Sequence, residues 1–256
     1  MKCEQYRRAY PYALFYDNSK NAYERKREAF QGVKNLTIAV PCKWMKELVE
    51  RSFLREYPVK VIYNGTDSGC FYPDRKRDEN DSEKIVLGVA NIWEKRKGLD
   101  YFKKLSRMLD ENYRIVLVGM NFIQRISFMT GRKKTKATLI RKTQSISELR
   151  RLYSNADVFV NPTLEDNFPT TNIEALSCGT PVITFNTGGS PESIDESCGR
   201  VIAREDVEGL KAAVEQICSQ SRLDVRENIA EKGRKFSKDG MLERYWRLYE
   251  RLYRQQ

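Results

Sequence analysis

Two acidic residues separated by seven positions, Asp166 and Glu174, lie on either side of the point where a helix is predicted to begin. The helix is predicted over residues 171–177, so its first backbone N–H groups lie between the two carboxyl groups. Such N–H groups attract anions, and a carboxylate accepts hydrogen bonds from hydroxyl groups. The spacing therefore indicates a site for a ligand that carries a phosphate beside a polyol, as a nucleotide sugar does.

The chain contains no histidine and six widely scattered cysteines without a Cys-x-x-Cys pair. Without histidine, Ser-His and Cys-His dyads and histidine metal sites are excluded. The cysteine spacing supports neither a zinc ribbon nor a dithiol redox site and is typical of reduced thiols in a cytosolic protein. Any chemistry must therefore come from carboxylates, cations and backbone groups, with no metal and no cofactor.

A formal net charge of +11 favours anionic partners, namely nucleotides, an anionic lipid surface or nucleic acid. The basic run 132–136 is typical of a solvated loop, so we expect no nucleic acid but some attraction to an anionic membrane surface. No apolar stretch of signal-peptide length follows the N-terminal charges, and apolar runs such as 115–120 are too short to span a bilayer. We expect a cytoplasmic protein that can lie peripherally at the inner face of the membrane.

From residue 85 onward, short β-branched runs alternate with segments of helical periodicity. Strands are predicted at 85–90, 115–118, 157–160 and 182–185, and helices at 99–109, 146–155, 171–177 and 207–217. This alternation predicts an α/β protein with a Rossmann-like, doubly wound parallel sheet. Ligands of such sheets bind beyond the carboxyl ends of the strands, and Asp166 lies in one of the loops there.

The loop 91–98 follows the strand 85–90 and carries three consecutive cations, Lys95, Arg96 and Lys97. These cations can face the same crevice as Asp166. A solvated basic turn is the alternative interpretation, and the sequence leaves both open.

The ends of the chain are less regular. Residues 36–40 and 59–62 are predicted strands around a helix at 43–54, which resembles the end of a βαβ unit, and a further helix is predicted at 21–30. The stretch 64–83 is rich in Gly, Asp and Pro and predicts a linker. A helix at 241–253 carries an aromatic stripe, which is typical of core packing.

Several linked motifs support a family resemblance. Asp166 and Glu174 are followed by a small-residue helix end, Gly179-Thr-Pro-Val and Gly188-Gly-Ser-Pro-Glu192, and the chain also has Asn64-Gly-Thr-Asp67 and Lys97-Gly98 further upstream. In these motifs, from about residue 34 to its end, the chain resembles the retaining GT-B glycosyltransferases of the large group 1 family. The resemblance implies transfer of a sugar from a nucleoside-diphosphate sugar to a polysaccharide or lipid-linked acceptor.

The resemblance also implies roles for individual residues. Asp166 would contact hydroxyls of the donor sugar, Glu174 would hold the ribose hydroxyls, and Lys97 would neutralise the leaving diphosphate without a metal. The backbone N–H groups of Thr170 and Thr171 would meet the diphosphate. The remaining expected donor-binding residues are Asn91, Arg96, Glu165, Phe168 and Asn172.

The chain departs from the family pattern at the site. The first acid is Asp rather than the common Glu, and Glu165 beside it is the alternative candidate. Pro169 replaces the usual Gly and has no N–H to offer a phosphate. Asn91 stands where the family has an arginine, so Arg96 or Lys95 is expected to substitute for it.

The expected organisation is a remnant of the N-terminal acceptor domain (1–63), a linker (64–83), a nucleotide-sugar-binding domain (84–238) and a C-terminal cross-over helix (239–256). Family members have a full acceptor domain that supplies a histidine, and the segment before residue 34 is too short for one. The alternative function is a nucleotide-sugar-binding module that is inactive without a partner acceptor-domain chain or a second copy of itself.

Overall fold

The computed structural model describes residues 17–74, 82–130, 135–220 and 223–254. The chain divides into two compact units, Met1–Val61 and Ile62–Gln256. In the first unit, α1 (Ser19–Phe30) precedes the strands β1 (Ile38–Val40) and β2 (Val59–Val61), which pair in parallel around α2 (Lys43–Glu50). The predicted βαβ unit is therefore confirmed, with a shorter connecting helix than expected.

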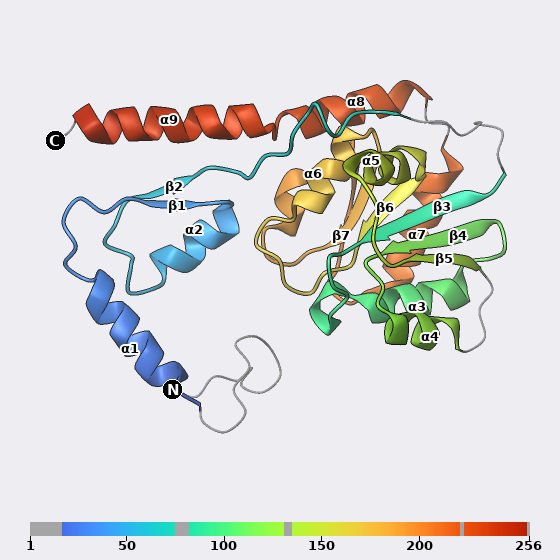
Figure 1. Ribbon diagram of the computed structural model, residues 1–256, viewed down its shortest axis with the longest axis horizontal. Coiled ribbons are helices and arrows are strands. Elements are labelled where there is room, and N and C mark those ends of the chain that lie inside the picture. The colour runs from blue at the N-terminus through green and yellow to red at the C-terminus, as the bar shows by residue number, and fades with distance from the viewer. Residues whose placement is uncertain (1–16, 75–81, 131–134, 221–222, 255–256) are drawn as a thin grey trace. The chain divides into compact units, whose positions relative to one another are not determined.

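The second unit is built on six parallel strands in the order β5-β4-β3-β6-β7-β8 (Figure 1). The strands are β3 (Lys84–Val89), β4 (Tyr113–Val118), β5 (Lys136–Ile140), β6 (Val158–Asn161), β7 (Val182–Phe185) and β8 (Gly199–Ile202). The chain starts in the middle at β3, winds outward to β5, returns to β6 and winds outward again to β8. This confirms the predicted doubly wound sheet and places the topological switch point between β3 and β6, where such folds bind ligands.

Helices cover both faces of this sheet (Figure 1). They are α3 (Leu99–Met108), α4 (Phe122–Met129), α5 (Ile146–Asn155), α6 (Thr170–Ser177), α7 (Val207–Ser219) and α8 (Leu223–Arg234), followed by α9 (Lys238–Arg254). One apolar core joins Val86 of β3 to side chains of α3, α4 and α7. A second joins the next residue, Leu87, to side chains of α5, α6 and α8. The side chains of successive strand residues thus pack into the two cores on opposite faces of the sheet.

The described part of the predicted linker is bound to the second unit. The N–H of Thr66 donates to the carbonyl of Phe236 at 2.9 Å, and the N–H of Lys238 donates to the carbonyl of Thr66 at 2.8 Å. The ring of Tyr63 packs on Phe168 and Phe236 with centroids 5.0 and 5.5 Å away. Residues 63–66 and 236–238 therefore run together as two neighbouring segments, one leading into the sheet and one leaving it.

The prediction that the aromatic stripe of the last helix packs in a core is wrong. Leu242, Trp246, Tyr249 and Tyr253 are all mostly exposed, and of this helix only Leu248 is buried. The period of the stripe was a correct sign of a helix, but an aromatic face does not by itself determine what covers it. Among the described residues, we find no helix with the length and apolar character needed to cross a membrane.

Candidate functional site

Three loops meet at the carboxyl ends of β3, β6 and β7. The N–H of Leu164, after β6, donates to the carbonyl of Arg96, after β3, at 2.7 Å. The hydroxyl of Thr163 donates to the same carbonyl at 3.2 Å, and the hydroxyl of Thr187, after β7, donates to the carbonyl of Thr163 at 2.7 Å. These bonds join the cationic loop to the acidic loop directly at the switch point.

Two glycines allow the loops to approach so closely. Gly98 has φ +80°, and a Cβ there would lie 2.1 Å from the carbonyl oxygen of Pro162. Gly188 has φ +56°, and a Cβ there would lie 2.0 Å from the carbonyl oxygen of Asp166. Both positions combine a left-handed conformation with a backbone contact that no side chain can fill. The two glycines therefore set the positions of Lys97 and Asp166.

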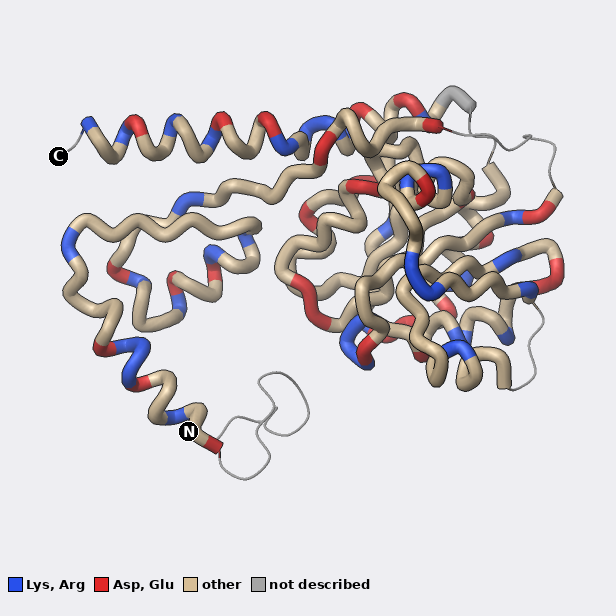
Figure 2. Tube along the Cα trace, viewed as in Figure 1, with Lys and Arg blue, Asp and Glu red and all other residues tan. Residues whose placement is uncertain are grey.

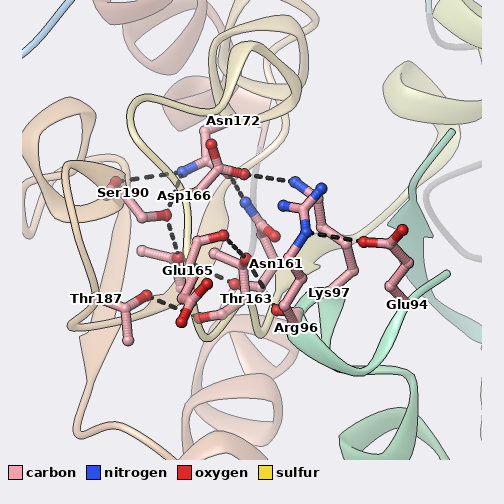
Figure 3. A network of polar contacts seen from close by, with 11 residues as sticks. Glu94, Arg96, Lys97, Asn161, Thr163, Glu165, Asp166, Asn172, Thr187 and Ser190 are labelled. Atoms are coloured by element: carbon pink, nitrogen blue, oxygen red, sulfur yellow. Dashed lines mark hydrogen bonds and ion pairs between the residues drawn. The ribbon is translucent and has the colours of Figure 1, made fainter. Parts of the chain in front are cut away.

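A buried polar network lies beneath the acidic loop (Figure 3). Asn172, which is fully buried, accepts a hydrogen bond from Asn161 at 2.8 Å and donates to the carbonyl and the hydroxyl of Ser190, both at 3.3 Å. The hydroxyls of Ser190 and Thr184 lie 2.6 Å apart. This network anchors the start of α6 to the ends of β6 and β7.

The predicted leaving-group cation and the predicted first acid form an ion pair. The ammonium of Lys97 lies 2.5 Å from a carboxylate oxygen of Asp166, and their side chains are 25% and 15% exposed (Figure 3). Of the two candidate acids, Asp166 is thus the one that contacts Lys97, whereas Glu165 is exposed beside it. Because the pair is only partly buried, water or a polar ligand can reach both groups.

A cavity of about 280 Å³ opens beside this pair. Its lining includes the predicted site residues Asn91, Arg96, Lys97 and Thr171, together with Trp93 and Asn161. The indole N–H of Trp93 donates to the carbonyl of Val118 at 2.8 Å and so holds the loop after β3 against β4. A larger hollow of about 370 Å³ lies along α3, and of the residues expected at the site its lining includes only Lys95, the alternative to Arg96. The smaller cavity is therefore the candidate site.

The start of α6 faces this cavity through Thr171. The residue before the helix is Pro169, which makes no side-chain cap. The N–H groups of the first helical residues, Thr170 and Thr171, have no acceptor within the helix, and the helix dipole places positive potential there. Together with Lys97, the start of α6 at Thr171 gives the cavity positive potential suited to an anion.

Glu174 lies apart from the residues that line the cavity. The hydroxyl of Tyr153 in α5 donates to its carboxylate at 2.9 Å, and Tyr153 is fully buried. Burial raises the pKa of the Glu174 carboxyl above its ordinary value, although hydrogen bonds from the hydroxyls of Tyr153 and Thr170 act in the opposite direction. Deep burial, and after it the charge of Glu174, in turn raise the pKa of Tyr153.

Glu174→Gln is expected to increase the free energy of unfolding at neutral pH. A carboxyl whose pKa is raised in the folded state destabilises the fold when ionised, and glutamine keeps the acceptor for Tyr153 without the charge. The difference should vanish as the pH falls below 4.5, the ordinary pKa of the group, because the carboxyl is then neutral in both states. Urea unfolding across this pH range measures it.

The exposed Glu231 of α8 provides the control, because Glu231→Gln changes the net charge equally at a solvated position. A Glu174→Gln variant that is less stable than the wild type at neutral pH would contradict this assignment of a costly buried charge.

Two predicted donor-binding residues have buried side chains. Phe168 is buried between Tyr63 and Phe236, and Asn172 belongs to the polar network. The side chains of both residues thus contact other residues of the protein and do not line the cavity. Sequence reasoning did not single out Asn161, Thr163, Tyr153 and Thr187, and it quoted Ser190 only as part of a motif; all five support the site. Asn161, Thr163 and Thr187 lie at or just after the ends of β6 and β7, which was the available signal, since parallel strands end at one edge of the sheet, whereas Tyr153 lies on α5.

Comparison with solved structures defines the class of fold. The chain superposes on sucrose-phosphate synthase from Thermosynechococcus elongatus with a TM-score of 0.77 and 20% identity, covering 95% of this chain and 65% of the other. It superposes on Anabaena Alr3699/HepE in complex with UDP with a TM-score of 0.70 and 15% identity, covering 91% and 68%. The α/β fold with its six-stranded parallel sheet is that of GT-B glycosyltransferase structures.

Sequence comparison shows the family. Residues 73–236 match Glycosyl transferases group 1, and the chain belongs to this family. It is 26% identical over 182 residues to spore coat protein SA of Bacillus subtilis, covering 62% of this chain and 48% of the relative. It is 22% identical over 215 residues to the capsular polysaccharide biosynthesis glycosyltransferase CapM of Staphylococcus aureus, covering 77% and 55%. The chain spans about half the length of the curated relatives that it matches.

Proposed function

We propose that the chain binds a nucleoside-diphosphate sugar at the switch point and is the donor-binding part of a retaining glycosyltransferase. The observation that carries the proposal is the cavity beside Lys97, with Arg96 and the start of α6 in its wall. The cation and the backbone donors suit a diphosphate, and Asp166 lies within hydrogen-bonding reach of a polar group next to Lys97. The structure of Anabaena HepE with UDP-glucose shows that a protein of this fold holds such a donor.

In this proposal, Lys97 exchanges its partner when the donor binds. Its ammonium leaves Asp166 for a phosphate oxygen, and Asp166 then accepts hydrogen bonds from hydroxyls of the donor sugar. When the bond between sugar and diphosphate breaks, negative charge grows on the phosphate oxygens, and Lys97 and the N–H groups of Thr170 and Thr171 stabilise it. The acceptor oxygen bonds to the anomeric carbon on the face that the diphosphate leaves, and the leaving phosphate takes the proton of the acceptor hydroxyl. The sugar therefore keeps its anomeric configuration. No metal takes part.

The remaining roles complete the donor site. Glu174 holds the ribose hydroxyls by turning from Tyr153 toward the cavity. Arg96 takes the role of the family's arginine, whose position Asn91 occupies in this chain. Glu165 lies beside Asp166 at the sugar end. Phe168 and Asn172 support the site without contacting the donor, because their buried contacts hold the loop after β6 and the start of α6 in place.

We propose a glycan or lipid-linked acceptor, since the relatives include CapM and the α-galactosylglucosyldiacylglycerol synthase of Streptococcus pneumoniae. The protein would then work in the cytoplasm, at the inner face of the membrane. Residues 1–63 would belong to the acceptor domain, 64–83 would be the linker, 84–238 the donor domain and 239–256 the cross-over helix.

A second candidate is a donor-binding module that needs an acceptor-domain chain or a second copy of itself. The observation that favours it is the exposed stripe of Leu242, Trp246, Tyr249 and Tyr253 on α9. An exposed apolar surface of this kind marks an interface in many proteins. Sugar transfer by the chain alone would exclude this second candidate without affecting the donor site.

Thermal unfolding of the chain with uridine, guanosine and adenosine diphosphates tests the proposal. One of the three is expected to stabilise the fold, by about 2.7 kcal/mol at a ligand concentration of about a hundred times its Kd. A chelator should leave this stabilisation unchanged, since Lys97 and α6 supply the positive charge. The absence of stabilisation by any diphosphate or its sugar would reject donor binding, and loss of the effect with the chelator would reject the metal-free mechanism.

A further inference from the structure

The short helix α4 exposes an apolar face. Phe122, Ile123, Ile126 and Met129 are 73%, 76%, 51% and 60% exposed, whereas Phe128 is buried in the core shared with α3 and α7. Four large apolar side chains in an eight-residue helix are far more than the scattered single residues that protein surfaces carry by default. The face therefore indicates an interaction.

Several hydrogen bonds fix α4 in place. Asn121 and Gln124 form a reciprocal capping box at its start, and the side chain of Gln124 also donates to the carbonyl of Trp93. Lys103 of α3 donates to the hydroxyl of Ser127 at 3.1 Å. Because Trp93 lines the candidate donor cavity, α4 is joined directly to the cavity wall. Whatever binds α4 is therefore held next to the candidate site.

The surroundings of α4 are basic. Residues 113–147 contain eight Lys or Arg and no Asp or Glu, and two of them, Arg114 and Lys136, pair with Glu83 from outside this segment. Arg125 lies on α4 itself, where Figure 2 shows no acidic residue. Arg141 and Lys142 are exposed and lie next to the start of α4, because the N–H groups of Gly119 and Met120 both donate to the carbonyl of Ile140. Three of the eight cations, at 132–134, lie outside the described residues, and the inference does not depend on them.

The size of the face argues against a stable protein interface. A helix of eight residues is about 12 Å long and about 10 Å wide, a footprint well below the roughly 800 Å² per partner that stable protein interfaces bury. A lipid surface needs no such area, since an amphipathic helix enters it by burying apolar side chains among headgroups while cations meet lipid phosphates.

We propose that α4 docks the protein on an anionic lipid bilayer, with Phe122, Ile123 and Ile126 inserted into the headgroup region and Arg125, Arg141 and Lys142 on lipid phosphates. Docking in this way would hold the cavity beside Trp93 close to the lipid surface. The docking does not depend on donor binding, so each can fail without the other.

Co-sedimentation with lipid vesicles tests this inference. The full chain should sediment with phosphatidylcholine vesicles that contain phosphatidylglycerol, and much less with phosphatidylcholine alone. Phe122→Gln with Ile126→Gln should lower the partition coefficient at least about tenfold, because two inserted side chains become polar. Arg125→Gln should lower it about fivefold and weaken its dependence on salt.

The matched control is Trp246→Gln on α9, which removes an equally exposed aromatic side chain from another helix and should leave sedimentation unchanged. The α4 positions are exposed, so unfolding midpoints and nucleoside diphosphate binding should match the wild type. Ile123→Gln, at the most exposed position, repeats the test if the double variant is less stable.

Lipid docking by α4 would be rejected if the wild type did not sediment with the vesicles, or if the α4 variants sedimented as well as the wild type. It would also be rejected if Trp246→Gln, and not the α4 variants, lowered sedimentation. A concentration-dependent dimer that Phe122→Gln with Ile126→Gln abolishes would assign the face to a second copy and likewise reject the lipid surface.

Discussion

Replacing Lys97 by alanine is expected to weaken nucleoside diphosphate binding about ten- to a hundredfold, the loss of one hydrogen bond to a charged group. In the free protein, Lys97 pairs with Asp166 at 2.5 Å. Without the lysine, the carboxylate of Asp166 would remain next to the phosphates and repel them. Isothermal titration calorimetry of the variant and the wild type measures the difference.

Substitution of Asp166, the partner of Lys97, should change the affinity for a nucleoside diphosphate in the opposite direction. Asp166→Asn releases Lys97 from its carboxylate, so nucleoside diphosphate binding should stay the same or become tighter, whereas binding of the intact sugar nucleotide should weaken. Lys104→Ala is the control, because it removes an exposed cation of α3 outside the candidate cavity. If Lys97→Ala bound the diphosphate no more weakly than Lys104→Ala, the role of Lys97 would be refuted.

Gly98→Ala is expected to destabilise the second unit by about 2–4 kcal/mol, the range of large single-site effects. The residue has φ +80°, and the added Cβ would lie 2.1 Å from the carbonyl oxygen of Pro162, a backbone atom that cannot turn away. The loop after β3 must therefore move off the loop after β6, and the pairing of Lys97 with Asp166 is lost. Gly188→Ala should behave alike, since its Cβ would meet the carbonyl of Asp166. Chemical unfolding and diphosphate titration measure both effects.

Gly32→Ala separates the clash from the left-handed conformation. Gly32 has φ +76° but nothing within 4 Å of an added Cβ, so its substitution should cost only about 1–2 kcal/mol. It also lies in the first unit, and diphosphate binding should not change. Equal effects of the three substitutions would show that the contact between the loops is unimportant.

Elements with strong periodicity were predictable from sequence. The predicted helix 146–155 and strand 182–185 match α5 and β7 residue for residue. β7 lies inside the sheet and is buried on both sides, so its sequence, Val-Ile-Thr-Phe, is a short run of β-branched and aromatic residues without polar alternation. α5 has one buried face and a polar N-terminal cap, Ser145, which produce a clear helical period.

Elements at the edges of the second unit were not predicted. The strands β5 and β8 form the two edges of the sheet, and their mixed burial gives no continuous apolar run. Helix α4 was missed because it exposes apolar residues, which contradicts the pattern of a helix that packs with its apolar side. The feature that concealed α4 in the sequence is thus the one on which its proposed lipid docking depends.

For the site, the sequence identified the motif residues but not their partners. Lys97 and Asp166 are 69 residues apart, and their contact depends on the order of the strands, which periodicity does not determine. The bond from Tyr153 to Glu174 likewise depends on the packing of α5 against α6. Motifs report residues close in sequence, whereas this site is assembled from three loops.

We propose that a nucleoside diphosphate binds with its phosphates between Lys97 and the start of α6. The most direct test is a titration of the isotope-labelled chain followed by the NMR signals of its backbone amides. We predict that the largest shifts occur at Thr170, Thr171 and the residues around Gly98. Largest shifts along α3, at Lys103, Lys104 and Arg107, or no shifts at saturating diphosphate, would contradict the account.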